Sequence, residues 1–201
     1  MNKEKTAAPA KTSPGLKLDP RCVGRFTGTL LVICLVTALL LGIVNQLTKP
    51  RIDAIQKAKQ ETAMRNVLAA AAYESVEGSF PDVSAVYRAQ GGATDGYVVE
   101  LSTSGSQGII EMMVGVDMEG KVTGVSVVSH SETPNIGTKV VESPSVLDRF
   151  IGMSRADGEI TVNSGSNRFD GVSGATVSSK GVTAGVNAAL SAVETLLAKE
   201  G

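Results

Sequence analysis

Hydrophobic positions follow different patterns in different parts of the chain. Residues 26–47 form a continuous apolar run of 22 residues that contains no charge. A helix of this length extends about 33 Å, which exceeds the roughly 30 Å of a bilayer's hydrocarbon core. Arg25 precedes the run and Lys49 follows it. The pattern therefore predicts a membrane-spanning helix over residues 26–47, preceded by a tail over residues 1–25.

Two other interpretations of the apolar run fit it less well. A cleaved signal peptide has a shorter apolar region and a cleavage site of small residues. This run instead ends in Asn-Gln-Leu-Thr-Lys-Pro, residues 45–50. A helix in the core of a small domain keeps a polar face, whereas every face is apolar here. We therefore interpret the run as a permanent anchor.

Helical periodicity returns on both sides of a central region. Apolar residues recur at intervals of three and four between Arg51 and Tyr73, and four alanines at 69–72 favour helix. We predict that this helix forms a stalk over residues 48–75. A short helix is expected at residues 145–151. Near the C-terminus, apolar residues at offsets of 0, 4, 7 and 11 from Val182 predict an amphipathic helix.

The central region has the pattern of strands. We predict strands at residues 97–101, 108–116 and 122–128, with a turn at 117–121, and a short strand at 159–162. The expected fold class is α+β: a mainly antiparallel sheet with packed helices, in one domain over residues 76–201.

Charge is distributed unevenly and limits the possible partners. Residues 1–47 contain six basic and two acidic residues, whereas residues 48–201 contain 13 basic and 18 acidic residues. A domain with a net charge of −5 does not suit a phosphate backbone, which excludes nucleic-acid binding. Six basic residues precede the span and five follow it closely. This small bias favours a cytoplasmic tail and a C-terminal domain on the outer side.

The two cysteines lie outside the predicted domain. Cys22 is at the edge of the span and Cys34 is in its middle. They show neither a disulfide framework nor the spacing of metal ligands. We therefore expect no metal site.

Two polar segments concentrate the residues that could carry chemistry. The segment His130–Thr138 follows a predicted strand and contains hydroxyls, a carboxylate and the only histidine. The segment Asp170–Ser179 is rich in small residues and leads into the last helix. A helix N-terminus leaves N–H groups free to bind an anion, with Ser178 or Ser179 as the expected N-cap. A phosphate-bearing ligand fits this position, although a simple capped helix start fits it as well.

A serine hydrolase is a poor alternative. Residues 171–175, Gly-Val-Ser-Gly-Ala, depart from the G-x-S-x-G pattern at Ala175. His130 is the only available base, and nothing in the sequence brings it to Ser173.

The two polar segments resemble motifs of a known family. Asp170-x-x-Ser173-Gly174-Ala175-Thr176 is similar to the D-x-x-(S/T)-G-A-T flavinylation motif of FMN-binding domains. These domains occur in the C subunit of the ion-pumping NADH:quinone reductase and in the G subunit of the Rnf complex. Residues 130–137 resemble the H-x-E-T-P-G-L-G segment of the same family, with Asn135-Ile136 in place of Gly-Leu. The length of the chain favours the G subunit of Rnf.

The resemblance implies a covalent flavin and its attachment site. Thr176 would hold one FMN per chain through a phosphoester, attached by a separate flavin transferase that recognises Asp170 and the residues after it. Other residues would contact the cofactor: Ser173, Gly174, Ala175, Val177, Ser178, His130, Glu132, Thr133, Ile136, Gly137 and Thr138. We assign no catalytic residue, because the flavin supplies the redox chemistry.

The resemblance also implies a function and partners. The protein would be an electron-transfer subunit of a membrane-bound ferredoxin:NAD⁺ oxidoreductase complex that couples electron flow to ion transport. Its partners would be the other subunits, the transferase and membrane lipid. Two alternatives remain: the C subunit of the quinone reductase, and a non-redox sensory or scaffold module with the same fold.

Overall fold

The computed structural model describes residues 20–78 and 80–200, and the chain divides into two compact units, residues 1–53 and 54–201. Helix α1 (Pro20–Val67) begins in the first unit and ends in the second. Large apolar side chains from Phe26 to Leu47 are 49–75% exposed. The hydroxyls of Thr29 and Thr37 donate to carbonyls four residues earlier, at 2.9 Å. This part of α1 therefore has the apolar surface and the internal hydrogen bonding of a membrane span.

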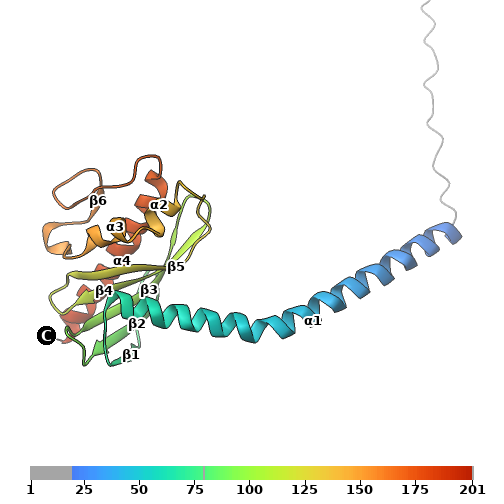
Figure 1. The fold of residues 1–201 in the computed structure, drawn as a ribbon, viewed down its shortest axis with the longest axis horizontal. Helices are drawn as coiled ribbons and strands as arrows, with labels where there is room; N and C mark the ends of the chain where they lie inside the picture. Colours follow the sequence, from blue (N-terminus) through green and yellow to red (C-terminus); the bar gives the residue numbers. More distant parts are fainter. Residues whose placement is uncertain (1–19, 79, 201) are drawn as a thin grey trace, which may run out of the picture. The chain divides into compact units, whose positions relative to one another are not determined.

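A five-stranded antiparallel sheet forms the centre of the second unit (Figure 1). The strands lie in chain order: β1 (Ala72–Val76), β2 (Val83–Gln90), β3 (Gly96–Ser104), β4 (Ile109–Asp117) and β5 (Val122–Ser129). The hydrophobic pattern predicted β3, β4, β5 and the turn between the last two, and the structure confirms them. The pattern did not resolve β1 and β2.

Both faces of the sheet are covered. Helix α4 (Thr176–Glu200) packs against β3 and β4 on one face (Figure 1). The main core joins alternate residues of these strands, Val99, Leu101, Met112 and Val114, to three residues of α4, Val182, Val186 and Ala189. On the other face, Val98 and Met113 pack against Ala63 and Val67 from the end of α1. Although α4 is long and apolar enough to cross a membrane, its most apolar window is 61% buried, so it is a core helix.

The connection between β5 and α4 consists of short elements. It contains α2 (Thr138–Val141), α3 (Pro144–Leu147), the 3₁₀ helices η1 (Asp148–Phe150) and η2 (Arg155–Asp157), and the parallel pair β6 (Thr161–Val162) and β7 (Arg168–Phe169). The helix expected at 145–151 corresponds to α3 and η1, and the expected strand at 159–162 to β6. The architecture confirms the α+β fold class.

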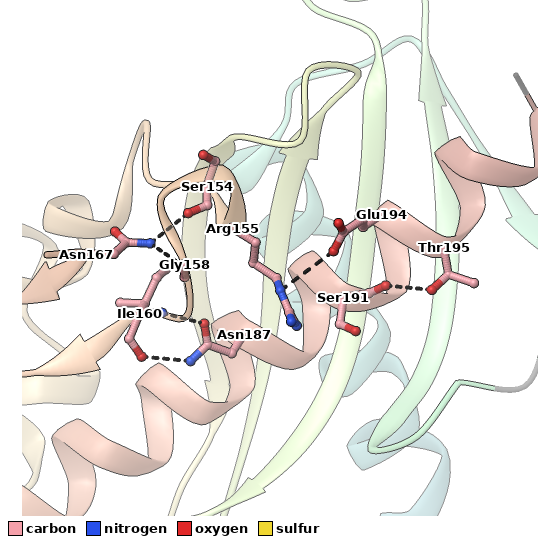
Figure 2. Close-up of polar contacts among 9 residues, drawn as sticks. All are labelled: Ser154, Arg155, Gly158, Ile160, Asn167, Asn187, Ser191, Glu194 and Thr195. Carbon is pink, nitrogen blue, oxygen red and sulfur yellow. Dashed lines mark hydrogen bonds and ion pairs between the residues drawn. The ribbon is translucent and has the colours of Figure 1, made fainter. Parts of the chain in front are cut away.

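Two asparagines hold the segment between β5 and α4 in place (Figure 2). One links the segment to α4, and the other links two parts of the segment to each other. Asn187 of α4 accepts a hydrogen bond from the Ile160 N–H at 3.0 Å and donates one to the Ile160 carbonyl at 2.8 Å. Asn167 donates to the carbonyls of Ser154 and Gly158, both at 2.7 Å. The backbone that leads to the Asp170–Ala175 loop is therefore held against α4.

The prediction of one helix through Tyr73 is wrong. Helix α1 ends at Val67, and residues 72–76 form β1, which pairs with residues 86–90 of β2. The Tyr73 hydroxyl donates to the Leu68 carbonyl at 2.8 Å and so binds the helix end. Strand pairing outweighs the weak helix preference of the alanines. The last turns of α1 belong to the domain core, so they are more than a stalk.

Candidate cofactor site

The two segments singled out from the sequence meet at one pocket of about 180 Å³. The loop after β5 forms one wall and the start of α4 forms another. Most of the residues implied by the family resemblance line the pocket: Glu132, Thr133, Ile136, Gly137, Gly174, Ala175, Thr176, Val177 and Ser178. Ser173, His130 and Thr138 do not line it.

A tight turn precedes α4 and orients its first residue. The Val172 carbonyl accepts a hydrogen bond from the Ala175 N–H at 3.0 Å. Gly174, the third residue of this turn, has a φ of +81°. A type II turn needs a positive φ at this position, which glycine adopts without strain. The Val172 N–H donates to the Ser179 hydroxyl at 3.2 Å, which fixes the turn to the helix.

The start of α4 leaves backbone N–H groups open. The Ala175 carbonyl accepts the first helical hydrogen bond, from Ser179, at 2.9 Å. Ala175 is therefore the N-cap, and its methyl group cannot accept a hydrogen bond. Within the described residues, the N–H groups of Thr176, Val177 and Ser178 meet no acceptor. The prediction that Ser178 or Ser179 is the N-cap is wrong, and the helix end is open to an anion.

The hydroxyls near this helix end differ sharply in accessibility. Thr176 and Ser173 are exposed. Ser178 is buried, and its hydroxyl donates to Glu132 at 2.6 Å. Ser179 is buried as well and accepts the Val172 N–H. Thr176 therefore presents the accessible hydroxyl of α4's first turn, at the pocket.

The loop before α2 is a second tight turn. The Thr133 carbonyl accepts the Ile136 N–H at 3.2 Å, and Asn135 has a φ of +62°. Pro134 and Asn135 occupy the second and third positions, where a type II turn favours proline and a residue that tolerates positive φ. Asparagine thus replaces the family's glycine without loss of the bend. Thr138 accepts the Asn135 N–H at 2.9 Å, so it shapes the loop.

Glu132 is buried between the two walls. One carboxylate oxygen accepts the Ser106 N–H and the other accepts the Ser178 hydroxyl, both at 2.6 Å. Gly105 and Gly137 leave the space that the carboxylate occupies, because a Cβ at either position would collide with a carboxylate oxygen. Nothing in the sequence indicated Ser106, which contributes a backbone N–H that any residue except proline supplies.

His130 lies outside this pocket. Its Nε2 is 3.1 Å from a carboxylate oxygen of Glu142, and its Nδ1 accepts the Glu132 N–H at 3.3 Å. It lines a separate groove of about 920 Å³ between α1, β5 and the α2–α3 segment. Both ring nitrogens are engaged away from Ser173, so the geometry gives no support to a serine hydrolase.

Asp170 lies on the surface before the turn. Its exposed carboxylate is 2.9 Å from Nε of Arg168, and its carbonyl accepts a hydrogen bond from Arg149 at 2.8 Å. The Arg149 contact, which the sequence did not reveal, fixes the backbone while the carboxylate remains exposed.

The residues at this pocket fit a flavin mononucleotide. The open N–H groups suit a phosphate, and Thr176 presents a hydroxyl beside them. Ile136 and Val177, which are 51% and 56% exposed, provide apolar surface at the edge of the pocket. A flavin has both of the required parts: an anionic end and a flat apolar ring.

Comparison with known proteins identifies the class and then the family. Residues 105–191 match the family model described as FMN-binding domain, and residues 23–67 match the model of the RnfG N-terminal region. The chain is therefore a single-span membrane protein with an FMN-binding domain.

Relatives along nearly the whole chain establish the family. The G subunit of the ion-translocating oxidoreductase complex of Methanosarcina acetivorans is 34% identical, and the match covers 91% of this chain and 99% of that protein. The G subunit of the proton-translocating ferredoxin:NAD⁺ oxidoreductase complex of Clostridium ljungdahlii is 32% identical over 88% of this chain and 95% of that protein. The chain belongs to the family of G subunits of ion-translocating oxidoreductase complexes.

A solved structure gives a more distant match. The C subunit of the Na⁺-translocating NADH-quinone reductase from Parabacteroides distasonis has a TM-score of 0.48 and 23% identity, covering 56% of this chain and 62% of that one.

Proposed function

We propose that this protein is an electron-transfer subunit of a membrane-bound, ion-translocating ferredoxin:NAD⁺ oxidoreductase complex and that it carries one FMN esterified to Thr176. The names of its relatives support the complex, and the matched FMN-binding domain supports the cofactor. The exposed Thr176 hydroxyl, beside open N–H groups at the start of α4, is the observation that carries the attachment site.

The protein's part in electron transfer is to hold and position the cofactor. The bound flavin supplies the redox chemistry. The N–H groups of α4 would stabilise its phosphate, and Ile136 and Val177 would offer apolar contacts to its ring. The pocket of about 180 Å³ is smaller than the roughly 300–1,000 Å³ that encloses a drug-sized ligand. It would therefore suit the phosphate end of the cofactor.

Attachment requires a second protein, because a threonine hydroxyl is a weak nucleophile without a base. In the proposed transfer, FAD donates its FMN part. The Thr176 Oγ1 forms a bond to the FAD phosphorus on the riboflavin side. The phosphoanhydride bond breaks, AMP leaves, and the transferase takes the hydroxyl proton. Asp170 serves recognition, since its carboxylate is exposed and lies outside the pocket lining.

Covalent attachment can be tested on denatured protein. The full chain, expressed with a flavin transferase, should stay fluorescent on a denaturing gel and exceed its sequence mass by one FMN less one water. Thr176→Val keeps the shape but removes the oxygen, so it should abolish both signals. A non-redox scaffold would show no flavin even with the transferase. Fluorescence that remains in Thr176→Val would contradict attachment at this residue.

The sidedness of the protein is part of the proposal. We place residues 1–25 in the cytoplasm, residues 26–47 in membrane lipid and residues 48–201 on the outer side, in a complex with the other subunits. The charge bias around the span and the family resemblance support this orientation. Protease added to spheroplasts should digest the C-terminal domain. Digestion of the N-terminal tail alone would show that the protein has the opposite orientation.

A further inference from the structure

A buried carboxylate lies beside the place where the proposed function puts an anion. Glu132 is 5% exposed and lines the same pocket as Thr176. A buried charge is costly unless hydrogen bonds compensate it. Glu132 accepts hydrogen bonds from the Ser106 N–H and the Ser178 hydroxyl at 2.6 Å, and a longer one from the Gln107 N–H at 3.4 Å.

These hydrogen bonds connect elements that are distant in sequence. Ser106 lies in the turn between β3 and β4, and Ser178 lies in the first turn of α4. We propose that Glu132 is a positioning residue that anchors the first turn of α4 to the β3–β4 turn and places a fixed negative charge beside the flavin site. This inference rests on the proposed function and deepens it.

The surrounding backbone is built to admit this carboxylate. A Cβ on Gly105 or Gly137 would collide with one of its oxygens. His130, two residues before it, accepts the Glu132 N–H and so holds the loop from outside. The carboxylate therefore has a formed site of its own, and it meets the helix through Ser178.

The helix start is open because Ala175 is its N-cap, and the hydrogen bond between Ser178 and Glu132 keeps it open. A free hydroxyl at Ser178 could rotate toward nearby backbone groups, as serines at helix ends commonly do. Its hydrogen bond to Glu132 holds it away from the open N–H groups. The negative charge acts in addition, because it disfavours added electron density nearby and so lowers the flavin's reduction potential.

Three variants separate geometry from charge. Glutamine at position 132 can keep both contacts, since its carbonyl accepts the Ser106 N–H and its amide donates to the Ser178 oxygen. Glu132→Gln therefore removes the charge and keeps the anchor. Glu132→Ala removes both, and Ser178→Ala removes only the link to α4. Glu194→Gln is the matched control, because Glu194 is an exposed carboxylate near the other end of α4, paired with Arg155 at 3.7 Å (Figure 2).

The anchor is tested by hydrogen–deuterium exchange on the full chain in detergent, prepared without a transferase and so without flavin. Amides of residues 179–182 should exchange about tenfold faster in Ser178→Ala and Glu132→Ala than in the parent protein, because the first turn opens more often. Glu132→Gln and Glu194→Gln should match the parent. Unchanged exchange in Ser178→Ala would overturn the proposal, even if Glu132→Ala fails to fold.

The charge is tested on the flavinylated full chain by redox titration. Glu132→Gln should shift the flavin's midpoint potential in the positive direction, whereas Glu194→Gln should leave it unchanged. A purely structural role of Glu132 would not move the potential in the glutamine variant, so an unchanged value overturns the proposal. Failure of the parent chain to acquire covalent flavin would contradict the proposed function instead, and the exchange result would stand by itself.

Discussion

Thr176 and Ser178 lie two residues apart in the first turn of α4, yet only Thr176 presents an accessible hydroxyl. Thr176 is exposed at the pocket, whereas Ser178 is 1% exposed and bound to Glu132. Neighbouring hydroxyls in one turn are thus made chemically unequal by the fold. This difference supports the proposed attachment at Thr176 by an observation that does not depend on the motif.

The first prediction concerns the choice between these hydroxyls. Thr176→Ser should retain covalent flavin, because it keeps an exposed oxygen at the same position, whereas Thr176→Val should lose it. Ser178→Ala should still be modified at Thr176. Peptide mass spectrometry after flavinylation locates the site, and flavin on Ser178 or Ser173 in the parent protein would contradict the prediction.

The second prediction concerns the turn at Asn135, where φ is +62°. Asn135→Val should lower the free energy of unfolding by about 1–2 kcal/mol, because a β-branched residue is strained in the left-handed region. Asn135→Gly should stay within about 0.5 kcal/mol of the parent, since glycine adopts this conformation freely. Chemical denaturation of the two variants checks the difference. Equal stabilities would show that the backbone at position 135 changes conformation.

The sequence predicted those helices and strands whose buried residues form a recognisable pattern over a short stretch of chain. Short apolar runs bounded by turn residues revealed β3, β4 and β5, and β3 and β4 bury side chains on both faces of the sheet. A 3.6-residue period revealed α4, because it packs one face against the core. The strand β1 was missed because the run of alanines at residues 69–72, which ends at the first residue of β1, favours helix locally, while its pairing with residues 86–90 is a long-range contact.

The site was predictable where chemistry depends on side-chain type and unpredictable where it depends on backbone. The motif around Thr176 drew attention to a loop whose residues 174–178 do line the pocket. The partner of Glu132 at Ser106 lies 26 residues away and is a backbone N–H, which leaves no trace in the sequence. His130 was expected at the flavin, but its side chain turns toward Glu142.

The third prediction concerns Tyr87 on the α1-covered side of the sheet. Burial, followed by the nearby Glu100 carboxylate, raises the pKa of the Tyr87 hydroxyl above 10.0. Folding therefore favours neutral tyrosine, and this contribution is present below about pH 10 and lost as pH rises through the folded-state pKa. Unfolding measured across this range should show a steeper loss of stability in the parent than in Tyr87→Phe. An equal loss of stability with rising pH in the two proteins would contradict this prediction.

The last prediction uses two glycines in the same conformation. Gly174 has a φ of +81° and Gly120 a φ of +77°, and a Cβ at either position would have no neighbour within 4 Å. Replacement by alanine should therefore cost about 1–2 kcal/mol of stability in both cases, from backbone strain alone. Gly174 forms the turn that orients Thr176, whereas Gly120 lies in the turn between β4 and β5.

The two variants should consequently differ in flavinylation although they match in stability. With purified transferase, Gly174→Ala should be modified markedly more slowly than the parent, and Gly120→Ala at the parent rate. Intact mass spectrometry over time gives the modified fraction, and thermal denaturation verifies that the stabilities match. Equal rates in both variants would mean that the transferase rearranges the turn before it acts, and the conformation at Gly174 would then serve only the folded domain.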